Sequence, residues 1–404
     1  MSVVLMRSLA GGAGVVAALV LVLAALAFCF WPLSGRSAEE WLPIAGRFAA
    51  RHLRGQHVNL SEAPQAGLRS GPPVPAVSLP RAANGLELLR APFRGEAVGV
   101  LKDRRRRTYT GVLAVKVSSF GLLDRAEQEA RHAAWGGVLA SLAREGSPVS
   151  RVQWLERTVP ADSDEIGRYL GDVWDRDSVP LESLAMQSYL DLAGSAPAAT
   201  KDHELFLCLQ IDAKRAWRQI KRTGGGGGLD AGACTVLLRE LEALGERLAS
   251  ADVHVAGALR PGMLASTLRV AFDPWSRPGL ARLASVDSRR DGIDERAAWP
   301  VGTEASWSNY RTDGALHATY WIASWPRTDV GSAFLSPLLL HAQMTRAISV
   351  TIEPVSPVRA IREVEAARTS DAADQDLRGR MGFMETARRR RMAEATERRE
   401  EELA

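Results

Sequence analysis

Hydrophobic residues dominate the first part of the chain, and polar residues interrupt them regularly afterwards. Residues 11–31 (GGAGVVAALVLVLAALAFCFW) contain no charged side chain. At about 1.5 Å of rise per residue, a helix over this run covers roughly 30 Å, the thickness of a bilayer's hydrocarbon core. A secretory signal peptide is the alternative, because Arg7 gives a positive start, but the run is long for that role. We therefore expect a retained membrane anchor.

Charges on either side of the predicted span indicate its orientation. Arg7 stands alone in the short N-terminal segment 1–10. Four arginines follow the span closely: Arg36, Arg47, Arg51 and Arg54. Positive residues favour the cytoplasmic side of a membrane. We expect a single-pass protein of the cell membrane with the bulk of the chain in the cytoplasm.

Two segments connect the predicted span to the rest of the chain. Residues 34–60 are amphipathic, with Trp41 and Phe48 set among basic residues. This juxtamembrane segment either lies on the inner membrane surface or packs on its own domain. Residues 61–84 are rich in proline and poor in bulky side chains, which predicts a linker.

Strand and helix periodicities alternate between residues 85 and 357. We predict strands at 97–102, 108–118, 149–157, 204–213, 252–258 and 346–353. We predict helices at 124–145 and 231–251, and a less regular helical region over 162–193. Strands, a long helix and a returning strand recur in this order. The pattern predicts an α+β fold with a mostly antiparallel sheet, helices on one face, and the outline of two split β-α-β halves.

The last segment, residues 358–404, is highly charged and carries a basic run at Arg388 to Arg391. Acidic residues in the same segment can pair with these arginines at helical spacing. We expect a charged helical arm.

Composition indicates a folded protein in a reducing compartment. The chain has 404 residues, of which 46% are hydrophobic and 24% charged, enough to bury a substantial core. Cys29, Cys208 and Cys234 form no CxxC pair, which favours a reducing compartment. A net charge of +4 is too small to indicate nucleic-acid binding without local clusters.

No residue pattern indicates catalysis, a cofactor or a metal. The seven histidines are scattered without HExxH spacing. No GxSxG elbow marks a nucleophile, although a Ser-His-Asp site needs only to assemble in space. The sequence therefore predicts a non-enzymatic protein without catalytic, cofactor-binding or metal-binding residues.

The glycine run Gly224–Gly228 could cradle a phosphate through its N–H groups. It lacks the Gly-Lys-Ser/Thr of a P-loop, which favours a flexible connection between a strand and a helix. Four basic residues precede it and could attract an anion: Arg215, Arg218, Lys221 and Arg222.

A basic cluster, Arg104, Arg105, Arg106 and Arg107, lies between two predicted strands. Such a cluster is usually the solvated tip of a hairpin. The functional interpretation is a contact with lipid headgroups, nucleic acid or an acidic partner.

Aromatic residues concentrate in residues 299–326, with four tryptophans and two tyrosines. Residues 315–324 alternate as a strand does, with bulky side chains on both faces. This pattern predicts a central strand or a protein interface, and an aromatic-rich core is the alternative.

The order of these aromatics is similar to that of a known family. Trp307, Tyr310, Thr319-Tyr320 and Trp325-Pro326, followed by the strand at 346–353, resemble the EccE-type domain of type VII (ESX) secretion membrane components. The similarity covers about residues 97–355 and extends to actinobacterial membrane proteins of conjugation or secretion loci. It implies an EccE-like cytoplasmic α+β domain over 85–357, acting in protein transport beside other membrane subunits and an ATPase.

We therefore expect a structural component of a type VII-like secretion or conjugative transfer machine, which works by protein–protein interaction and contacts membrane lipid. Its candidate interaction residues are Trp307, Tyr310, Tyr320, Trp321, Trp325, Arg104, Arg105, Arg106 and Arg107. Two alternatives remain. One is an enzyme of the inner membrane surface that uses the glycine run on a lipid or nucleotide substrate. The other is a membrane-tethered scaffold that binds nucleic acid.

Overall fold

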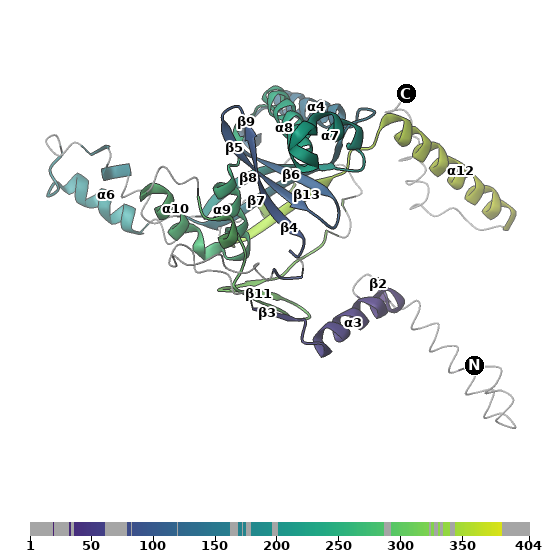
Figure 1. Ribbon diagram of the computed structural model, residues 1–404, viewed down its shortest axis with the longest axis horizontal. Coiled ribbons are helices and arrows are strands. Elements are labelled where there is room, and N and C mark those ends of the chain that lie inside the picture. The colour runs from purple at the N-terminus through teal and green to yellow at the C-terminus, as the bar shows by residue number, and fades with distance from the viewer. Residues whose placement is uncertain are drawn as a thin grey trace. The chain divides into compact units, whose positions relative to one another are not determined.

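In the computed structural model, the chain forms two compact units (Figure 1). The structure describes residues 19, 32–33, 36–60, 79–81, 83–118, 120–161, 169–171, 173–174, 179–195, 201–286, 292–322, 325–326, 330–331, 334–339 and 344–381. Unit 1 combines residues 1–62 with 301–321, and unit 2 combines residues 63–300 with 322–404. The aromatic segment 301–321 thus belongs to the same unit as the juxtamembrane segment, whereas the sequence placed it in one domain over 85–357.

Unit 1 contains a helix, a two-stranded ladder and a small antiparallel sheet. The ladder pairs β1 (Pro32–Leu33) with β2 (Arg36–Ser37), and α3 (Ala38–Leu53) follows directly. The sheet has the order β12-β11-β10-β3, with β3 at Val58–Leu60, β10 at Gly302–Ala305, β11 at Tyr310–Thr312 and β12 at Ala315–His317. Strand β3 therefore pairs with a strand about 240 residues later in the chain.

Helix α3 packs its aromatic residues against the segment that follows β10. Trp41 and Phe48 are seven residues apart, two helical turns, so both lie on one face. Their rings contact Trp307, at centroid distances of 5.9 and 5.0 Å. Residues 34–60 were expected either to lie on the membrane surface or to pack on the protein. Trp41 and Phe48 pack on the protein. Arg47 and Arg51 stay exposed.

Unit 2 is built on a seven-stranded antiparallel sheet. Its strands run in the order β13-β7-β8-β6-β5-β4. Strand β9 pairs with the half of β6 that β5 leaves unpaired. The strands are β4 (Leu86–Phe93), β5 (Glu96–Asp103), β6 (Thr108–Val117), β7 (Val149–Pro160), β8 (Lys201–Asp212), β9 (Val253–Ala258) and β13 (Arg346–Ile352).

Four of these strands form two interleaved split β-α-β units. Along the chain the order is β6, α4, β7, β8, α8, β9, whereas across the sheet it is β9-β6-β8-β7, with every neighbouring pair antiparallel. This is the β-α-β-β-α-β arrangement that the sequence predicted. Strands β5 and β4 extend it on one side, and β13 extends it beyond β7.

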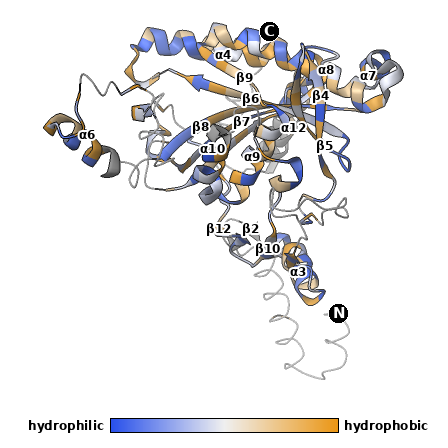
Figure 2. Ribbon diagram, turned by 60° about the vertical axis from the view of Figure 1, so that its left-hand side comes forward, coloured by the Kyte–Doolittle hydropathy of each residue, from blue (hydrophilic) through white to orange (hydrophobic). Residues whose placement is uncertain are grey.

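Helices cover both faces of the sheet, so the prediction of helices on one face is wrong. Helices α4, α7 and α8 lie on one side in both views, and α9 and α10 lie on the other (Figures 1 and 2). The reason is that β8 buries both of its faces. Leu207 and Leu209 pack under α8, while Phe206 and Cys208 alternate with them and pack with Leu264 of α9.

The helix bounds follow recognisable sequence signals. Asp124 begins α4 by accepting a hydrogen bond of 2.8 Å from the Glu127 N–H. Buried leucines recur along α8 at helical spacing, from Leu237 to Leu248. The helices of unit 2 include α4 (Arg125–Leu142), α6 (Leu184–Ser195), α7 (Trp217–Gly224), α8 (Gly228–Leu248), α9 (Pro261–Phe272), α10 (Arg277–Val286), α11 (Ser336–Leu339) and α12 (Pro357–Met381). Short 3-10 turns lie at η1 (Phe120–Leu122), η3 (Gly225–Gly227), η4 (Ala249–Ala251), η5 (Pro274–Ser276) and η6 (Glu295–Ala298).

Several predicted segments differ from the structure or lie beyond its described part. The strand predicted at 315–324 ends at His317, and residues 318–322 are not a strand. Apart from Leu19, the predicted span 11–31 lies outside the described residues, as do most of the linker 61–84, Cys29 and the basic run 388–391. Among the residues that are described, no helix is long and apolar enough to cross a membrane. The predicted arm begins as α12.

Candidate functional site

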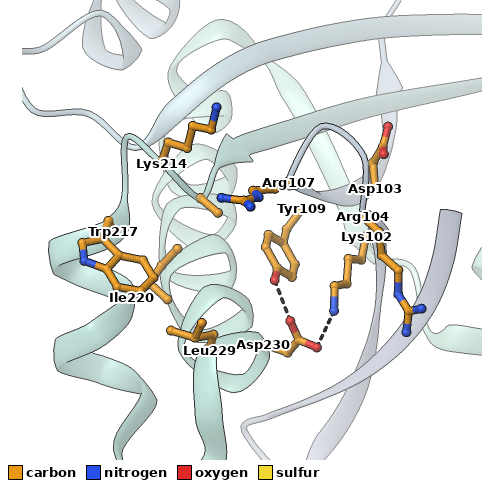
Figure 3. A pocket seen from close by; sticks show the side chains of 11 residues that line it. Lys102, Asp103, Arg104, Arg107, Tyr109, Lys214, Trp217, Ile220, Leu229 and Asp230 are labelled. Atoms are coloured by element: carbon orange, nitrogen blue, oxygen red, sulfur yellow. Dashed lines mark hydrogen bonds and ion pairs between the residues drawn. The ribbon is translucent and has the colours of Figure 1, made fainter. Parts of the chain in front are cut away.

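A pocket with a basic rim lies where the β5–β6 hairpin meets the start of α7 and the start of α8 (Figure 3). Its volume is about 740 Å³. It brings together the arginine cluster of residues 104–107 and the segment around the glycine run, two features that the sequence treated separately. The lining residues are Lys102, Asp103, Arg104, Arg107, Tyr109, Ala213, Lys214, Trp217, Ile220, Leu229 and Asp230. We call this cavity the basic pocket.

The arginine cluster forms the tip of the hairpin, as its position between two strands predicted. Asp103 pairs with Thr108 across the end of the ladder. The Asp103 carboxylate accepts hydrogen bonds from the Arg105 and Arg106 N–H groups, at 2.8 and 3.0 Å. Arg107 closes the turn with a φ of 58°, a left-handed conformation that favours glycine.

One wall of the basic pocket is a hydrogen-bonded triad of Tyr109, Asp230 and Lys102. The Tyr109 hydroxyl donates to Asp230 Oδ1 at 2.6 Å, and Lys102 Nζ donates to Asp230 Oδ2 at 2.5 Å (Figure 3). Tyr109 comes from β6, Lys102 from β5 and Asp230 from the first turn of α8. A carboxylate in the first turn of a helix is also favoured by the helix dipole.

These contacts change two pKa values in opposite directions. Burial of Tyr109, with the hydrogen bond to Asp230 and the charge of that carboxylate, raises the pKa of the tyrosine well above 10. Burial alone would raise the pKa of Asp230, but hydrogen bonds from Lys102 and Tyr109 and the charges of Lys102 and Arg104 lower it overall. At neutral pH a neutral Tyr109 hydroxyl therefore donates to an Asp230 carboxylate.

The cations of the basic pocket differ in how they are held. Arg104 pairs with Glu87 at 2.9 Å, and Lys102 is engaged by Asp230. The side chains of Arg107 and Lys214 are exposed, and among the described residues neither makes an ion pair. In Figure 3 the Arg107 guanidinium extends into the cavity between Lys214 and Tyr109. Opposite lies an apolar wall of Trp217, Ile220 and Leu229.

The glycine run joins two helices rather than a strand and a helix. Helix α7 occupies residues 217–224, and η3 leads into α8 at Gly228. Gly225 and Gly228 have φ values of 46° and 81°, which reverse the chain. Helix α7 then packs closely on α8, because a Cβ on Gly232 would overlap the Ile220 carbonyl oxygen and approach Gly224 Cα to 2.9 Å. The run therefore allows close helix packing. Of the basic residues around it, Lys214 lines the basic pocket, whereas Arg215, Arg218, Lys221 and Arg222 do not.

The candidate aromatic residues fall into three environments. Trp307 contacts α3, and Tyr310 is half-buried in β11. Tyr320 and Trp321 follow β12 and are 91% and 84% exposed. Trp325 belongs to unit 2 and contacts Phe334 edge to face, at 6.4 Å. A central strand at these positions is contradicted, since β12 is the end strand of its sheet.

A second cavity, of about 540 Å³, lies on the α9 face of the sheet. Its most buried charge is Arg157, which pairs with Glu204 at 2.5 Å and donates to the Thr267 carbonyl at 2.7 Å. Arg277 pairs with the same carboxylate at 2.9 Å. Arg277 also lies 3.9 Å from Asp202, so both of these arginines in the cavity are held by carboxylates.

Sequence reasoning found the arginine cluster but missed the residues that complete the basic pocket. The sequence did not single out Tyr109, Lys214, Trp217 or Asp230. The available signal was a carboxylate opening a helix after a basic and aromatic stretch, KRAWRQIKR. In the part of the chain that is described, no cluster of three or more His, Cys, Asp or Glu side chains is arranged to hold a metal.

Comparison of the chain with family models, curated proteins and solved structures finds no match. The resemblance to the EccE-type domain therefore stays a prediction.

Proposed function

We propose that the protein is a non-enzymatic, membrane-anchored structural component of a type VII-like secretion or conjugative transfer machine. It acts by presenting an aromatic surface to other subunits of that machine. In this proposal the hydrophobic run 11–31 anchors the chain, and the α+β fold is cytoplasmic.

The observation that carries the proposal is the exposure of two adjacent aromatic residues. Tyr320 and Trp321 are 91% and 84% exposed and come three and four residues after the end of β12, the end strand of the unit 1 sheet. A large aromatic side chain removes about 150–250 Å² from water when it is covered. Tyrosine and tryptophan are also the residues most enriched where protein interfaces are strongest, each contributing about 2 kcal/mol or more there.

The grouping of chain segments in unit 1 also supports the proposed function. The candidate residues Trp307 and Tyr310 lie in the same compact unit as α3, which begins seven residues after the predicted span. The exposed aromatics therefore belong to the unit whose helix follows the span. A surface on the unit whose helix follows the anchor in sequence suits contact with other membrane subunits.

Affinity purification of the full chain from mild-detergent extracts of its host tests the proposal. We expect a membrane ATPase and other secretion or conjugation components to be recovered in fixed ratio. The Trp321→Ala variant should lose these proteins, while Trp275→Ala, which removes an exposed tryptophan of unit 2, should retain them.

Recovery of the wild-type chain alone and monodisperse would contradict the proposal. So would equal recovery of the same partners with Trp321→Ala and with the wild type, since the aromatic pair would then have no part in assembly.

A further inference from the structure

We propose that the basic pocket is a binding site for a small phosphate ester, with the phosphate held by Arg107 and Lys214 and the organic part lying on Trp217 and Leu229. The shared chemistry is a phosphate group joined to an apolar or planar substituent, as in a phospholipid headgroup or a nucleotide. This inference is independent of the proposed function, because all its residues belong to unit 2.

The charge of the basic pocket favours an anion. Four basic and two acidic side chains line it. Both carboxylates are already engaged, Asp103 by N–H groups of its own turn and Asp230 by Tyr109 and Lys102. The rim therefore has an excess of positive charge that its own acidic residues do not neutralise. A ligand with two negative charges would balance it.

The backbone at Arg107 gives an independent reason to assign a role to its side chain. This residue has a φ of 58° at the end of a tight hairpin, where glycine would avoid the steric penalty of a Cβ. Arginine here carries a guanidinium into the cavity (Figure 3). Strained backbone conformations of this kind concentrate at ligand sites.

The Tyr109–Asp230–Lys102 triad makes one wall of the basic pocket rigid. Its two hydrogen bonds, of 2.6 and 2.5 Å, join strands β5 and β6 to the first turn of α8. The hairpin that carries Arg107 is thereby fixed against the helix pair that carries Trp217 and Leu229. Preorganised charges lose little entropy when a ligand binds.

The other wall and the size of the cavity select for a substituted phosphate. Trp217 is 48% and Leu229 51% exposed, so both offer apolar surface to a ligand. A volume of about 740 Å³ lies in the range of small-molecule sites, about 300–1,000 Å³. Inorganic phosphate would leave the apolar wall uncovered, so an ester should bind more tightly.

Calorimetric titration of the full chain in an uncharged detergent tests this inference, with empty micelles as the blank. The probes are inorganic phosphate, ADP, and dihexanoyl phosphatidic acid below its own micelle concentration. We expect saturable binding of at least one ester, tighter than phosphate. A preference for ADP identifies a nucleotide site, and a preference for the short lipid identifies a headgroup site.

Single-residue variants separate pocket binding from general attraction to positive charge, and Arg106 and Arg107 of one hairpin tip provide the direct comparison. Arg107→Gly and Lys214→Gln should each weaken ester binding about tenfold or more, as expected for a lost charged hydrogen bond. Arg106→Gln removes the same charge from a tip residue that does not line the cavity, and should change binding less than about twofold. The Arg107→Gly chain should keep or raise its melting temperature, because glycine suits the left-handed turn.

The inference is overturned if no probe binds saturably at millimolar concentration. It is also overturned if Arg106→Gln weakens binding as much as Arg107→Gly does, a result that indicates diffuse attraction of polyanions such as nucleic acid.

Discussion

Gly232 shows how a single residue can decide the packing of two helices. It lies in α8 where α7 crosses, and the Thr223 hydroxyl on α7 donates to its carbonyl oxygen at 3.2 Å. Space at this point is taken up by the backbone of α7, with Gly224 N and Cα atoms 2.9 Å from where a Cβ would stand. Backbone atoms cannot move aside as the end of a flexible side chain can.

We predict that Gly232→Ala lowers the free energy of unfolding by about 2–3 kcal/mol, the cost of overpacking a tight contact. Helix propensity alone would give the opposite sign, a gain of about 1 kcal/mol. Gly245→Ala is the control on the same helix, because a Cβ there would meet only Val255, at 4.0 Å. Urea denaturation should show Gly245→Ala neutral or stabilising. Equal effects of both substitutions would refute the close packing.

Tyr109 gives a prediction about alkaline pH. Its pKa is raised in the folded state, so its contribution to stability is complete below the unfolded tyrosine value of about 10 and is lost as pH rises towards the folded value. We predict that the free energy of unfolding falls above about pH 10 and falls less steeply in Tyr109→Phe. At pH 7 the variant should lose about 1 kcal/mol for the missing hydrogen bond.

Denaturation curves at pH 7 and pH 10.5 for both chains provide the measurement. The difference between the chains isolates Tyr109 from the other four tyrosines. Identical pH dependence in the two chains would show that the tyrosine hydroxyl is not held by Asp230.

At the scale of the residue, the sequence revealed charge clusters but not which side chains meet. The Arg104–Arg107 run and the turn it forms were predictable from consecutive arginines between two strands. The contact of the same hairpin with α8 was not, because Lys102 and Asp230, which make it, are 128 residues apart in the chain. Nothing local to Tyr109 signals that its hydroxyl finds a carboxylate.

At the scale of the element, strong local patterns were predictable and short or edge elements were not. Helix α8 and strands β5 to β8 carry apolar residues at regular spacing, and the predicted bounds lie within a few residues of the observed ones. Strand β4 was missed because LELLRAPF does not alternate and contains Pro92, which an edge strand tolerates. Helix α9 was missed as well, although Pro261 occupies its first turn.

The strand predicted over residues 315–324 of the aromatic segment forms only in part. Residues 315–324 alternate well, yet β12 stops at His317 and the bulkiest side chains beyond it stay in solvent. Alternating side chains indicate that a segment can form a strand. The strand forms only where a neighbouring strand is in place to pair with it. In the sheet as described, β12 has β11 on one side only.

Helix α3 should depend on Trp307. We predict that Trp307→Ala makes the backbone amides of α3 exchange with deuterium about tenfold faster or more, because the aromatic contacts with Trp41 and Phe48 contribute about 0.5–1.5 kcal/mol each. Hydrogen exchange read by mass spectrometry measures this. Trp275→Ala, in unit 2, should leave exchange in α3 unchanged. Unaltered exchange in Trp307→Ala would contradict the packing of α3 on this segment.

At the scale of the whole molecule, the general class was predictable and the division of the chain was not. An α+β fold with two split β-α-β units follows from the order of strands and helices. The grouping of residues 301–321 with residues 1–62 does not, because it depends on β3, three residues long, pairing with β10. Three residues carry too little periodicity to predict a strand, and a pairing across 240 residues has no local signal.

We propose that Tyr320 and Trp321 contact another subunit of a membrane machine. Site-specific photo-crosslinking in the native host tests it most directly, with a photoreactive residue placed at Tyr320 and, as control, at the exposed Leu122 of unit 2. We predict that the Tyr320 probe crosslinks to one defined membrane or ATPase component that the Leu122 probe does not reach. The absence of a specific crosslink at Tyr320, or the same products from both positions, would contradict the claim.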